Sequence, residues 1–498
     1  MKLEKLLEGV DGLRAPSGEI PDKDIGDIYF DSRKASGAGL FVCLRGSLSD
    51  GHLYAASAYE KGCRFFVAEK PLNDLPDDAF VFLCRDTRAA LAVMSDNLFG
   101  HPSDELFVIG ITGTKGKTTT ALMIYQILNA AGLKCGYIGS NGIDYGDFHI
   151  DATNTTPESY ILQMYMRHMR LAGVKYLVME VSSQALYMSR VHSVRFDICV
   201  FTNLSVDHIG GHEHPTFEHY KNCKKSLFSD HGAKTVILNA DDGYATEMAE
   251  AVPPEATILR YAMHSNADIR ATAPTRYRKS DSLGIEFSFT MDGKKFDVSL
   301  SFPGNFSVYN ALAAIAVCQK CGVETEEVVR HLSAVKISGR FEIVEAMKEA
   351  TFVIDYAHNK VSLTSALETL RQYQPTRLIC LFGSVGGRTF GRRAELGEAA
   401  ASLADLCILT SDNPDGEDPN KILNDIAAQF GDGSCPYRII PDRAEAIRYA
   451  VSIAKEGDIF LFAGKGHERY QLVYGEKLPF SEKEILLAEC QKRLSPQT

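Results

Sequence analysis

Short apolar runs of strand type alternate with helical stretches along the whole chain. From residue 1 to about 103, the runs IYF, LFVCL, CRFFVAE and FVFLC are separated by turn signals and helices. Near 269–302, polar and apolar positions alternate, which is typical of antiparallel strands. Between about 104 and 337, continuous apolar runs predict buried parallel strands at 175–182, 196–204 and 234–240.

A new alternation of strands and helices begins after SGRFE at 338–342, with the apolar runs TFVIDYA, TRLICLFG, LCILTSD and DIFLFAG. A chain of 498 residues is too long for one core, and its length suggests about three domains. We therefore predict an α/β protein with a small N-terminal α/β domain, a central parallel-sheet domain and a C-terminal doubly wound, Rossmann-like domain, at 1–103, 104–337 and 338–498.

A glycine-rich loop, GITGTKGKTTT at 110–120, lies between a predicted strand and a predicted helix. Such a loop aims backbone N–H groups and the positive end of the helix dipole at one point, which suits a polyphosphate. Lys117 adds a charge for the phosphates, and Thr118 or Thr119 offers a hydroxyl for Mg²⁺. The glycines recur every third residue, at Gly110, Gly113 and Gly116, unlike the standard phosphate loop. The loop predicts nucleotide binding and leaves open how the phosphate is used.

Composition narrows the class of protein. The formal net charge of −11 argues against a nucleic-acid or membrane-surface partner. The N-terminus has no signal-peptide core, and no apolar run is long enough for a membrane span. The cysteines are scattered through apolar segments, so we expect a reducing compartment, the cytoplasm. Cys318 and Cys321 form a CxxC inside a helical run, where packing explains them better than zinc does.

Polar residues follow several predicted strand ends in the central segment. Glu180 ends a strand close to the glycine loop, where a Mg²⁺ ligand is expected. Asp207 and His208 follow the next strand and face the same crevice. Further histidines follow, but no cysteine lies near them and the spacing fits no usual ligand set, so zinc is not predicted. Lys224 and Lys225 are, by default, on a solvated helix face.

Three loops of the last third, IDYAHN at 354–359, SDNPDGEDP at 411–419 and AGKGHERYQ at 463–471, also begin at strand ends. Arg388 lies on a fourth such loop. Each loop alone is compatible with ordinary turn chemistry. Because the carboxyl ends of strands in one parallel sheet share an edge, we expect the four loops to form a ligand crevice.

Together these strings resemble the Mur ligase family of peptidoglycan precursor enzymes, over essentially the whole chain. The nearest type adds a diamino acid to UDP-N-acetylmuramoyl-L-alanyl-D-glutamate. Residues 29–62 resemble its uridine-binding domain, and Met188 departs from a glutamine often found in the family. The resemblance implies contacts to the UDP-linked substrate by Ser32, Thr155, Thr156, Ser182 and Arg190.

The resemblance also assigns the nucleotide site. It implies catalytic roles for Lys117, Glu180, His208 and Lys224, with two Mg²⁺ ions held by Thr118, Glu180, His208 and a CO₂-derived carbamate on Lys224. Lys225 stays open as the carbamylated residue. The remaining contacts to ATP are implied for Gly113, Thr114, Gly116, Thr119, Asn310, Arg340, Asp355 and His358.

The implied reaction is ATP-dependent amide formation through an acyl phosphate, in a protein that we expect to be a monomer. Residues implied to hold the incoming amino acid are Arg388, Asp412, Asn413, Asp415, Gly464 and Glu468. Enzymes that add meso-diaminopimelate carry arginine where this chain has Asp415, and a carboxylate there favours the ammonium of L-lysine. We therefore expect L-lysine, with meso-diaminopimelate and L-ornithine as alternatives. Two other functions are less consistent with the sequence. A folylpolyglutamate synthase lacks the uridine-binding N-terminal domain that residues 29–62 resemble. A non-catalytic paralogue is expected to lose Lys117, Glu180, His208 or Lys224, and this chain has all four.

Overall fold

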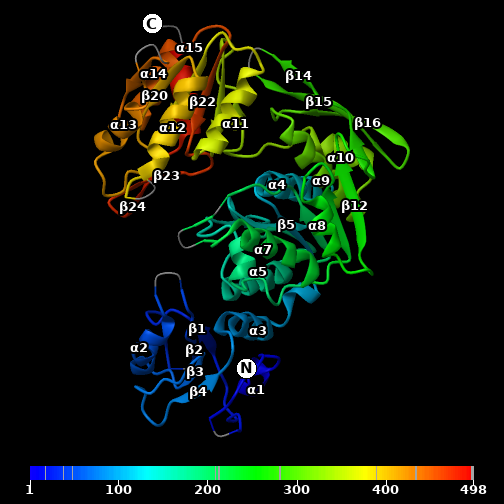
Figure 1. Ribbon diagram of the computed structural model, residues 1–498, viewed down its shortest axis with the longest axis vertical. Helices are drawn as coiled ribbons and strands as arrows, with labels where there is room; N and C mark the ends of the chain where they lie inside the picture. Colours follow the sequence, from blue (N-terminus) through cyan, green and yellow to red (C-terminus); the bar gives the residue numbers. More distant parts are fainter. Residues whose placement is uncertain are drawn as a thin grey trace. The chain divides into compact units, whose positions relative to one another are not determined.

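The computed structural model describes residues 1–494 except 17, 38, 47–48, 208, 211–212, 280–281, 388–389 and 432–434. The chain forms two compact units, whose helices and strands are labelled in Figure 1. One contains Met1–Arg270 with Leu312–Val328, and the other contains Ala271–Ala311 with Val329–Thr498. Among the described residues, no helix combines the length and the apolarity that crossing a membrane requires.

The first unit begins with a parallel sheet in the order β1-β2-β3-β4. Neighbouring residues of β2 point to opposite faces. Leu40 and Val42 pack with Leu3 and Leu91, whereas Phe41 packs with Ala58. Helices therefore cover both faces. The elements are α1 (Leu3–Leu7), β1 (Asp27–Tyr29), β2 (Gly39–Val42), η1 (Gly51–Tyr54), α2 (Ala55–Glu60), β3 (Phe65–Ala68), β4 (Phe80–Leu83), α3 (Thr87–Phe99) and η2 (Pro102–Asp104).

A second sheet of this unit has parallel strands in the order β12-β11-β10-β5-β9-β6, extended by antiparallel β7 and β8. Because β9 and β10 lie on opposite sides of β5, the strand order reverses there, and ligands of such sheets bind at this point. The elements are β5 (Phe107–Thr112), α4 (Lys117–Ala130), β6 (Cys135–Gly139), β7 (Gly142–Tyr145), β8 (Phe148–Ile150), α5 (Ser159–Leu171), β9 (Tyr176–Glu180), α6 (Ser183–Tyr187), β10 (Ile198–Phe201), α7 (Phe217–Ser229), β11 (Thr235–Asn239), α8 (Ala245–Glu250), β12 (Thr257–Ala262) and β13 (Ile269–Ala271).

In the second unit, β14 (Thr275–Arg278), β15 (Leu283–Met291) and β16 (Lys294–Leu300) are antiparallel, as their alternating pattern predicted. They precede α9 (Phe306–Lys320) and α10 (Thr325–Leu332) in the chain. Cys318 and Cys321 are buried at the end of α9, which confirms the packing interpretation of the CxxC.

The main sheet of the second unit has the order β17-β18-β22-β19-β20-β21, in which only β17 is antiparallel. Cys380 and Phe382 of β19 pack in the layer of α11, α12 and α13, whereas Ile379 and Leu381 face α14 and α15. The elements are β17 (Glu342–Val344), β18 (Ala350–Asp355), α11 (Lys360–Arg371), β19 (Leu378–Phe382), α12 (Phe390–Leu403), β20 (Leu406–Leu409), α13 (Pro419–Ala427), β21 (Tyr437–Ile439), α14 (Arg443–Ile453), β22 (Asp458–Ala463), β23 (Tyr470–Val473), β24 (Glu476–Pro479) and α15 (Glu482–Leu494). The predicted α/β architecture is confirmed.

Candidate functional site

The glycine loop joins β5 to α4 through two backbone conformations that favour glycine. Gly113 has φ +148°, and a Cβ atom there would lie 2.0 Å from Thr202 Oγ1. Gly116 has φ +87° and is the N-cap of α4. The backbone conformation therefore explains why two of the three regularly spaced residues, Gly113 and Gly116, are glycines. The loop leads directly into the N-terminus of a 14-residue helix, which favours anions.

Glu180 ends β9, next to β5, and its side chain is fully buried. Its Oε1 accepts hydrogen bonds from Tyr137 Oη at 2.8 Å and the Ser140 N–H at 2.8 Å. Its Oε2 accepts from Thr118 Oγ1 at 2.9 Å. A carboxylate and a hydroxyl are hard oxygen ligands, so this pair fits Mg²⁺. Two residues predicted to hold Mg²⁺ are therefore in contact.

Lys117 and Lys224 both reach the glycine loop. Lys117 Nζ donates to Gly113 O at 2.9 Å, and Lys224 Nζ donates to the same oxygen at 2.8 Å. Burial, and next the charge of Lys117, lowers the pKa of Lys224 well below its usual value. Lys225 instead lies 3.9 Å from Glu247. Lys224, the first of the two candidates for carbamylation, is the lysine beside the loop.

Other predicted residues surround the Glu180 pair. Thr114 Oγ1 lies 3.1 Å from Tyr220 Oη, and Thr119 is half-buried on α4. Thr155 Oγ1 lies 2.9 Å from Ser140 Oγ, and Thr156 Oγ1 donates to Glu180 O at 2.8 Å. His208 lies outside the described residues.

The remaining residues assigned to the UDP-linked substrate lie in three places. Ser182 is the N-cap of α6 and accepts from Ala185 N. Arg190 donates to Thr156 O at 3.0 Å, which holds its guanidinium near the two threonines. Ser32 follows β1, and Lys61 Nζ donates to its carbonyl at 2.8 Å.

The expectation that no cysteine lies near the histidines is wrong. Cys223 Sγ lies 3.8 Å from His219 Nδ1 and 4.0 Å from His214 Nδ1. His219 and Cys223 are four residues apart on α7, which puts them on one face of the helix. The spacing of the histidines fits no usual set of zinc ligands, so the sequence pattern did not reveal that one helical turn brings His219 and Cys223 together.

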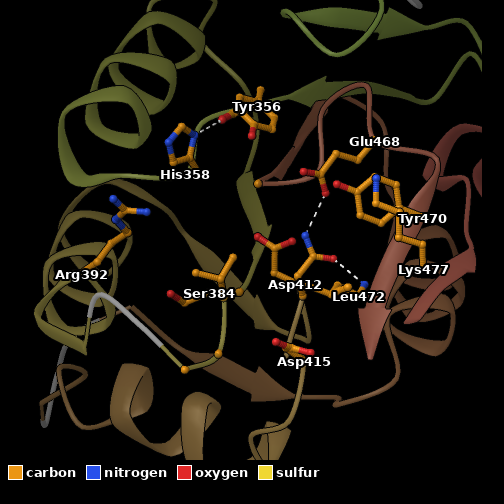
Figure 2. Close-up of a pocket in the computed structure, with 16 residues that line it drawn as sticks. Tyr356, His358, Ser384, Arg392, Asp412, Asp415, Glu468, Tyr470, Leu472 and Lys477 are labelled. Atoms are coloured by element: carbon orange, nitrogen blue, oxygen red, sulfur yellow. Dashed lines mark hydrogen bonds between the residues drawn. The ribbon is translucent and has the colours of Figure 1, made fainter. Parts of the chain in front are cut away.

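A cavity of about 560 Å³ in the second unit lies over the carboxyl ends of β18, β19, β20 and β22. Figure 2 shows His358 and Arg392 on one side of it, and Glu468, Tyr470 and Lys477 on the other. Five of the six residues predicted to hold the amino acid line the cavity: Asp412, Asn413, Asp415, Gly464 and Glu468. The sixth, Arg388, lies outside the described residues.

Asn413 and Lys465 organise the polar side of this cavity. Asn413 Nδ2 donates to Glu468 Oε2 at 2.9 Å, and Asn413 Oδ1 accepts from Leu472 N at 2.9 Å (the dashed lines that end at Glu468 and Leu472 in Figure 2). Lys465 is fully buried, and its Nζ donates to Asn413 Oδ1 at 2.5 Å, Glu468 Oε2 at 3.2 Å and Tyr470 O at 2.8 Å. A buried charge needs such partners. Sequence reasoning missed Lys465, although a charged residue between two glycines at a strand end is a recognisable signal.

Gly464 and Asp415 have special backbones. Gly464 has φ +107°, and a Cβ atom there would lie 2.8 Å from Asp412 Oδ2. Asp415 has φ +50°, and its Oδ1 accepts from the Gly475 N–H in the turn of the β23–β24 hairpin at 2.7 Å. One oxygen of Asp415 therefore supports the hairpin.

Arg443 lies beneath the cavity and was also missed from the sequence. It is buried at the start of α14 and donates to Ser411 O at 3.0 Å, Ala463 O at 2.9 Å and Glu482 Oε1 at 2.8 Å. This guanidinium ties two cavity-forming strand ends to α15.

Three of the residues assigned to adenine, ribose or phosphates, Arg340, Asp355 and His358, lie at or next to the end of β18. Asp355 Oδ2 accepts from Phe341 N at 2.8 Å, and burial raises the pKa of Asp355. The Arg340 guanidinium lies 5.0 Å from the Tyr356 ring centroid. His358 lines the cavity, and Asn310 is buried on α9.

Family models match most of the chain: the Mur ligase middle domain at residues 111–318 and the Mur ligase glutamate ligase domain at 339–466. A UDP-N-acetylmuramoyl-L-alanyl-D-glutamate–2,6-diaminopimelate ligase of Caldanaerobacter subterraneus subsp. tengcongensis is 41% identical, covering 99% of this chain and 100% of that protein. One of the same name from Geobacillus kaustophilus is 38% identical with the same coverage.

A solved structure of a UDP-N-acetylmuramoyl-L-alanyl-D-glutamate–2,6-diaminopimelate ligase superposes with a TM-score of 0.70, at 26% identity and 99% coverage of both chains. The similarity spans the phosphate-loop sheet and the cavity-bearing sheet alike. This chain therefore belongs to the Mur ligase family, the ATP-dependent ligases of peptidoglycan synthesis.

Proposed function

We propose that this chain forms an amide bond between a diamino acid and the D-glutamyl γ-carboxylate of UDP-N-acetylmuramoyl-L-alanyl-D-glutamate, with ATP as energy source. Relatives with 38–41% identity over 99% of the chain bear this activity in their names. The observation that carries the proposal is the buried contact of Glu180 with Thr118 beside the glycine loop. The carboxylate of Glu180 and the hydroxyl of Thr118 are oxygen ligands for the cation that accompanies a nucleoside triphosphate.

The residues of the loop divide the work on the triphosphate. Backbone N–H groups of the loop and the start of α4 face the phosphates. Lys117, now folded back on Gly113 O, is long enough to turn towards them. Glu180 and Thr118 would hold a Mg²⁺ ion, which would supply positive charge against the transferring phosphoryl group.

The reaction proceeds in two displacements. An oxygen of the γ-carboxylate bonds to the γ-phosphorus of ATP. The bond between that phosphorus and the oxygen that bridges it to the β-phosphate breaks, which gives an acyl phosphate and ADP. The amine then bonds to the acyl carbon, loses a proton and expels phosphate. Thr155, Thr156 and Arg190 hold the acceptor peptide beside Glu180 in this assignment.

Lys224 carries a carbamate in the active form under this proposal. Burial, and next the charge of Lys117, favours the neutral amine of Lys224, whose nitrogen lies beside Gly113 O. The neutral nitrogen bonds to the carbon of CO₂ and releases one proton to solvent, which converts the neutral amine into an anion with two oxygens. Those oxygens suit a second Mg²⁺.

The amino acid added is meso-diaminopimelate in our proposal. The cavity offers charges of both signs: Asp412 and Glu468 for ammonium groups, and Lys477 and Arg392 for carboxylates. The distal end of diaminopimelate carries both an ammonium and a carboxylate, whereas that of L-lysine carries only an ammonium. The names of the relatives agree with this choice and give no support to the expected preference for L-lysine.

L-Lysine is the second candidate because of Asp415. Its carboxylate stands where diaminopimelate-adding enzymes are expected to carry arginine, and Oδ1 is engaged with Gly475 N. In this alternative, Oδ2 of Asp415 accepts a hydrogen bond from the distal ammonium. L-Ornithine shares this chemistry with a shorter reach.

Phosphate release with UDP-N-acetylmuramoyl-L-alanyl-D-glutamate, ATP and Mg²⁺ tests both levels of the proposal. We expect turnover with meso-diaminopimelate to exceed that with L-lysine or L-ornithine. Faster turnover with L-lysine would refute the choice of amino acid, and no turnover with any amine would refute the ligase assignment. Glu180→Gln is expected to abolish turnover. Glu247→Gln is the matched control, because Glu247 pairs with Lys221 and Lys225.

A further inference from the structure

We propose that His214, His219 and Cys223 bind a thiophilic divalent metal ion of the Zn²⁺ class. The three side chains offer two imidazole nitrogens and one sulfur whose ligand atoms all lie within 4.8 Å of one another. This site is distinct from the pair of Glu180 and Thr118, which offers only oxygen.

The distances are close to those of a metal centre. His214 Nδ1 lies 2.9 Å from His219 Nδ1, and Cys223 Sγ lies 4.0 Å and 3.8 Å from the two nitrogens. Tetrahedral Zn²⁺ with its usual bond lengths separates two nitrogens by about 3.3 Å and a nitrogen from a sulfur by about 3.6 Å. Shifts of a few tenths of an ångström therefore convert the cluster into a ligand set.

Neighbouring groups hold the ligands in orientation. His214 is 2% exposed, and its Nε2 lies 2.9 Å from Ser183 Oγ, so Nδ1 is the nitrogen turned to the other ligands. Two of the ligands share one face of α7, and the Tyr187 ring of α6 meets His219 edge-on at 4.8 Å between centroids. Ligands carried by helices are held more rigidly than ligands on loops.

The donor set decides which metal is favoured. Imidazole and thiolate select Zn²⁺ and similar d-block ions, whereas Mg²⁺ requires oxygen. Binding replaces the Cys223 thiol proton and any proton shared between the imidazoles, and these protons pass to solvent. Three protein ligands leave the fourth tetrahedral position for water or an added donor.

Occupation of this site links two segments of the first unit. The Gly210 N–H donates to His214 O at 2.8 Å, so His214 is bonded to the backbone at Gly210. Cys223 immediately precedes Lys224 on α7. An ion at the cluster therefore fastens the loop at Gly210 to the helical turn that carries Lys224.

Titration of the metal-stripped full chain with Co²⁺, in saturating Mg²⁺, tests the proposal. We expect one equivalent to give a thiolate-to-cobalt charge-transfer band with intense tetrahedral visible bands, and Zn²⁺ to remove both. Cys223→Ser should abolish the charge-transfer band and weaken binding about tenfold or more, and His219→Ala should weaken binding to a similar extent. Cys435→Ser is the matched control, since Cys435 is also half-buried but lies near Cys407.

A second measurement uses the unchanged chain, in case a variant fails to fold. Zn²⁺ should slow alkylation of Cys223 by iodoacetamide about tenfold or more, as measured on its peptide by mass spectrometry, and leave Cys435 unprotected. The proposal is overturned if no charge-transfer band forms, if the band survives in Cys223→Ser, if Cys435→Ser removes it, or if Zn²⁺ leaves Cys223 unprotected.

Discussion

Replacement of Lys477 by glutamine tests how the cavity selects its amino acid. Lys477 lies on β24 at the rim of the cavity, with Nζ 4.2 Å from the Tyr470 ring centroid. In our proposal it pairs with the distal carboxylate of meso-diaminopimelate. Glutamine keeps a polar side chain of similar reach and removes the charge.

The position of Lys477 sets the size of the effect. A hydrogen bond to a charged group contributes about 1.5–3 kcal/mol when shielded, and an exposed ion pair only about 0.2–1 kcal/mol. Lys477 is exposed before the ligand binds, but it stands on an aromatic ring at the cavity wall. We therefore expect a loss of about 1–2 kcal/mol, equivalent to about five- to thirtyfold in kcat/KM for meso-diaminopimelate.

The assay is phosphate release at fixed ATP and UDP-linked substrate with varied diamino acid. L-Lysine has no distal carboxylate, so its kcat/KM should change by less than about twofold. Lys483→Gln is the matched control, because Lys483 pairs with Glu342 outside the cavity lining. Equal losses for both amino acids, or an unchanged value for meso-diaminopimelate, would refute the pairing.

Three further predictions concern the buried groups. Lys465→Met leaves the carboxylates of Asp412 and Glu468 without their shared cation, and urea unfolding should show a loss of about 3–5 kcal/mol; a loss below about 1 kcal/mol contradicts the role of Lys465. Removal of CO₂ should inactivate the enzyme and bicarbonate should restore it, as followed by phosphate release. At a fixed concentration of dissolved CO₂, the neutral form of Lys224 grows as pH rises through its lowered pKa, so reactivation should be faster at higher pH; reactivation that slows with pH at fixed CO₂, or Lys224→Ala with full activity, refutes carbamylation. Gly113→Ala introduces a Cβ atom 2.0 Å from Thr202 Oγ1 and should abolish binding of a fluorescent ATP analogue, and retained binding contradicts the steric argument.

The features that sequence predicted well are those with short-range causes. Apolar runs give strands, and the residue that ends each run lies at a known edge of the sheet, so the positions of Glu180, Asp355 and Asp412 at or just after strand ends could be predicted from sequence alone. The glycine loop is equally local, because its conformation is determined by glycines a few residues apart.

The features that sequence missed depend on distant partners. The polar sequence around Tyr474 and Gly475 gave no strand prediction, yet the β23–β24 hairpin forms, with Asp415 bonded to its turn from 60 positions earlier. Lys465 and Arg443 resemble surface cations until their buried acceptors are known. The contact of Cys223 with His214 requires that His214, which precedes α7 in the chain, lie against that helix.

The ion pair of Arg443 with Glu482 has a consequence for the order in which the chain is made. Both side chains are buried, and Arg443 is synthesised 39 residues before its carboxylate partner. At translation rates of about 5–20 residues per second, that interval lasts about 2–8 seconds. During it, docking of α14 against the strand ends would bury a guanidinium without its counter-charge, at a cost of several kcal/mol. The cavity floor is therefore expected to close only after α15 begins to emerge, whereas the phosphate-loop sheet has by then long been complete.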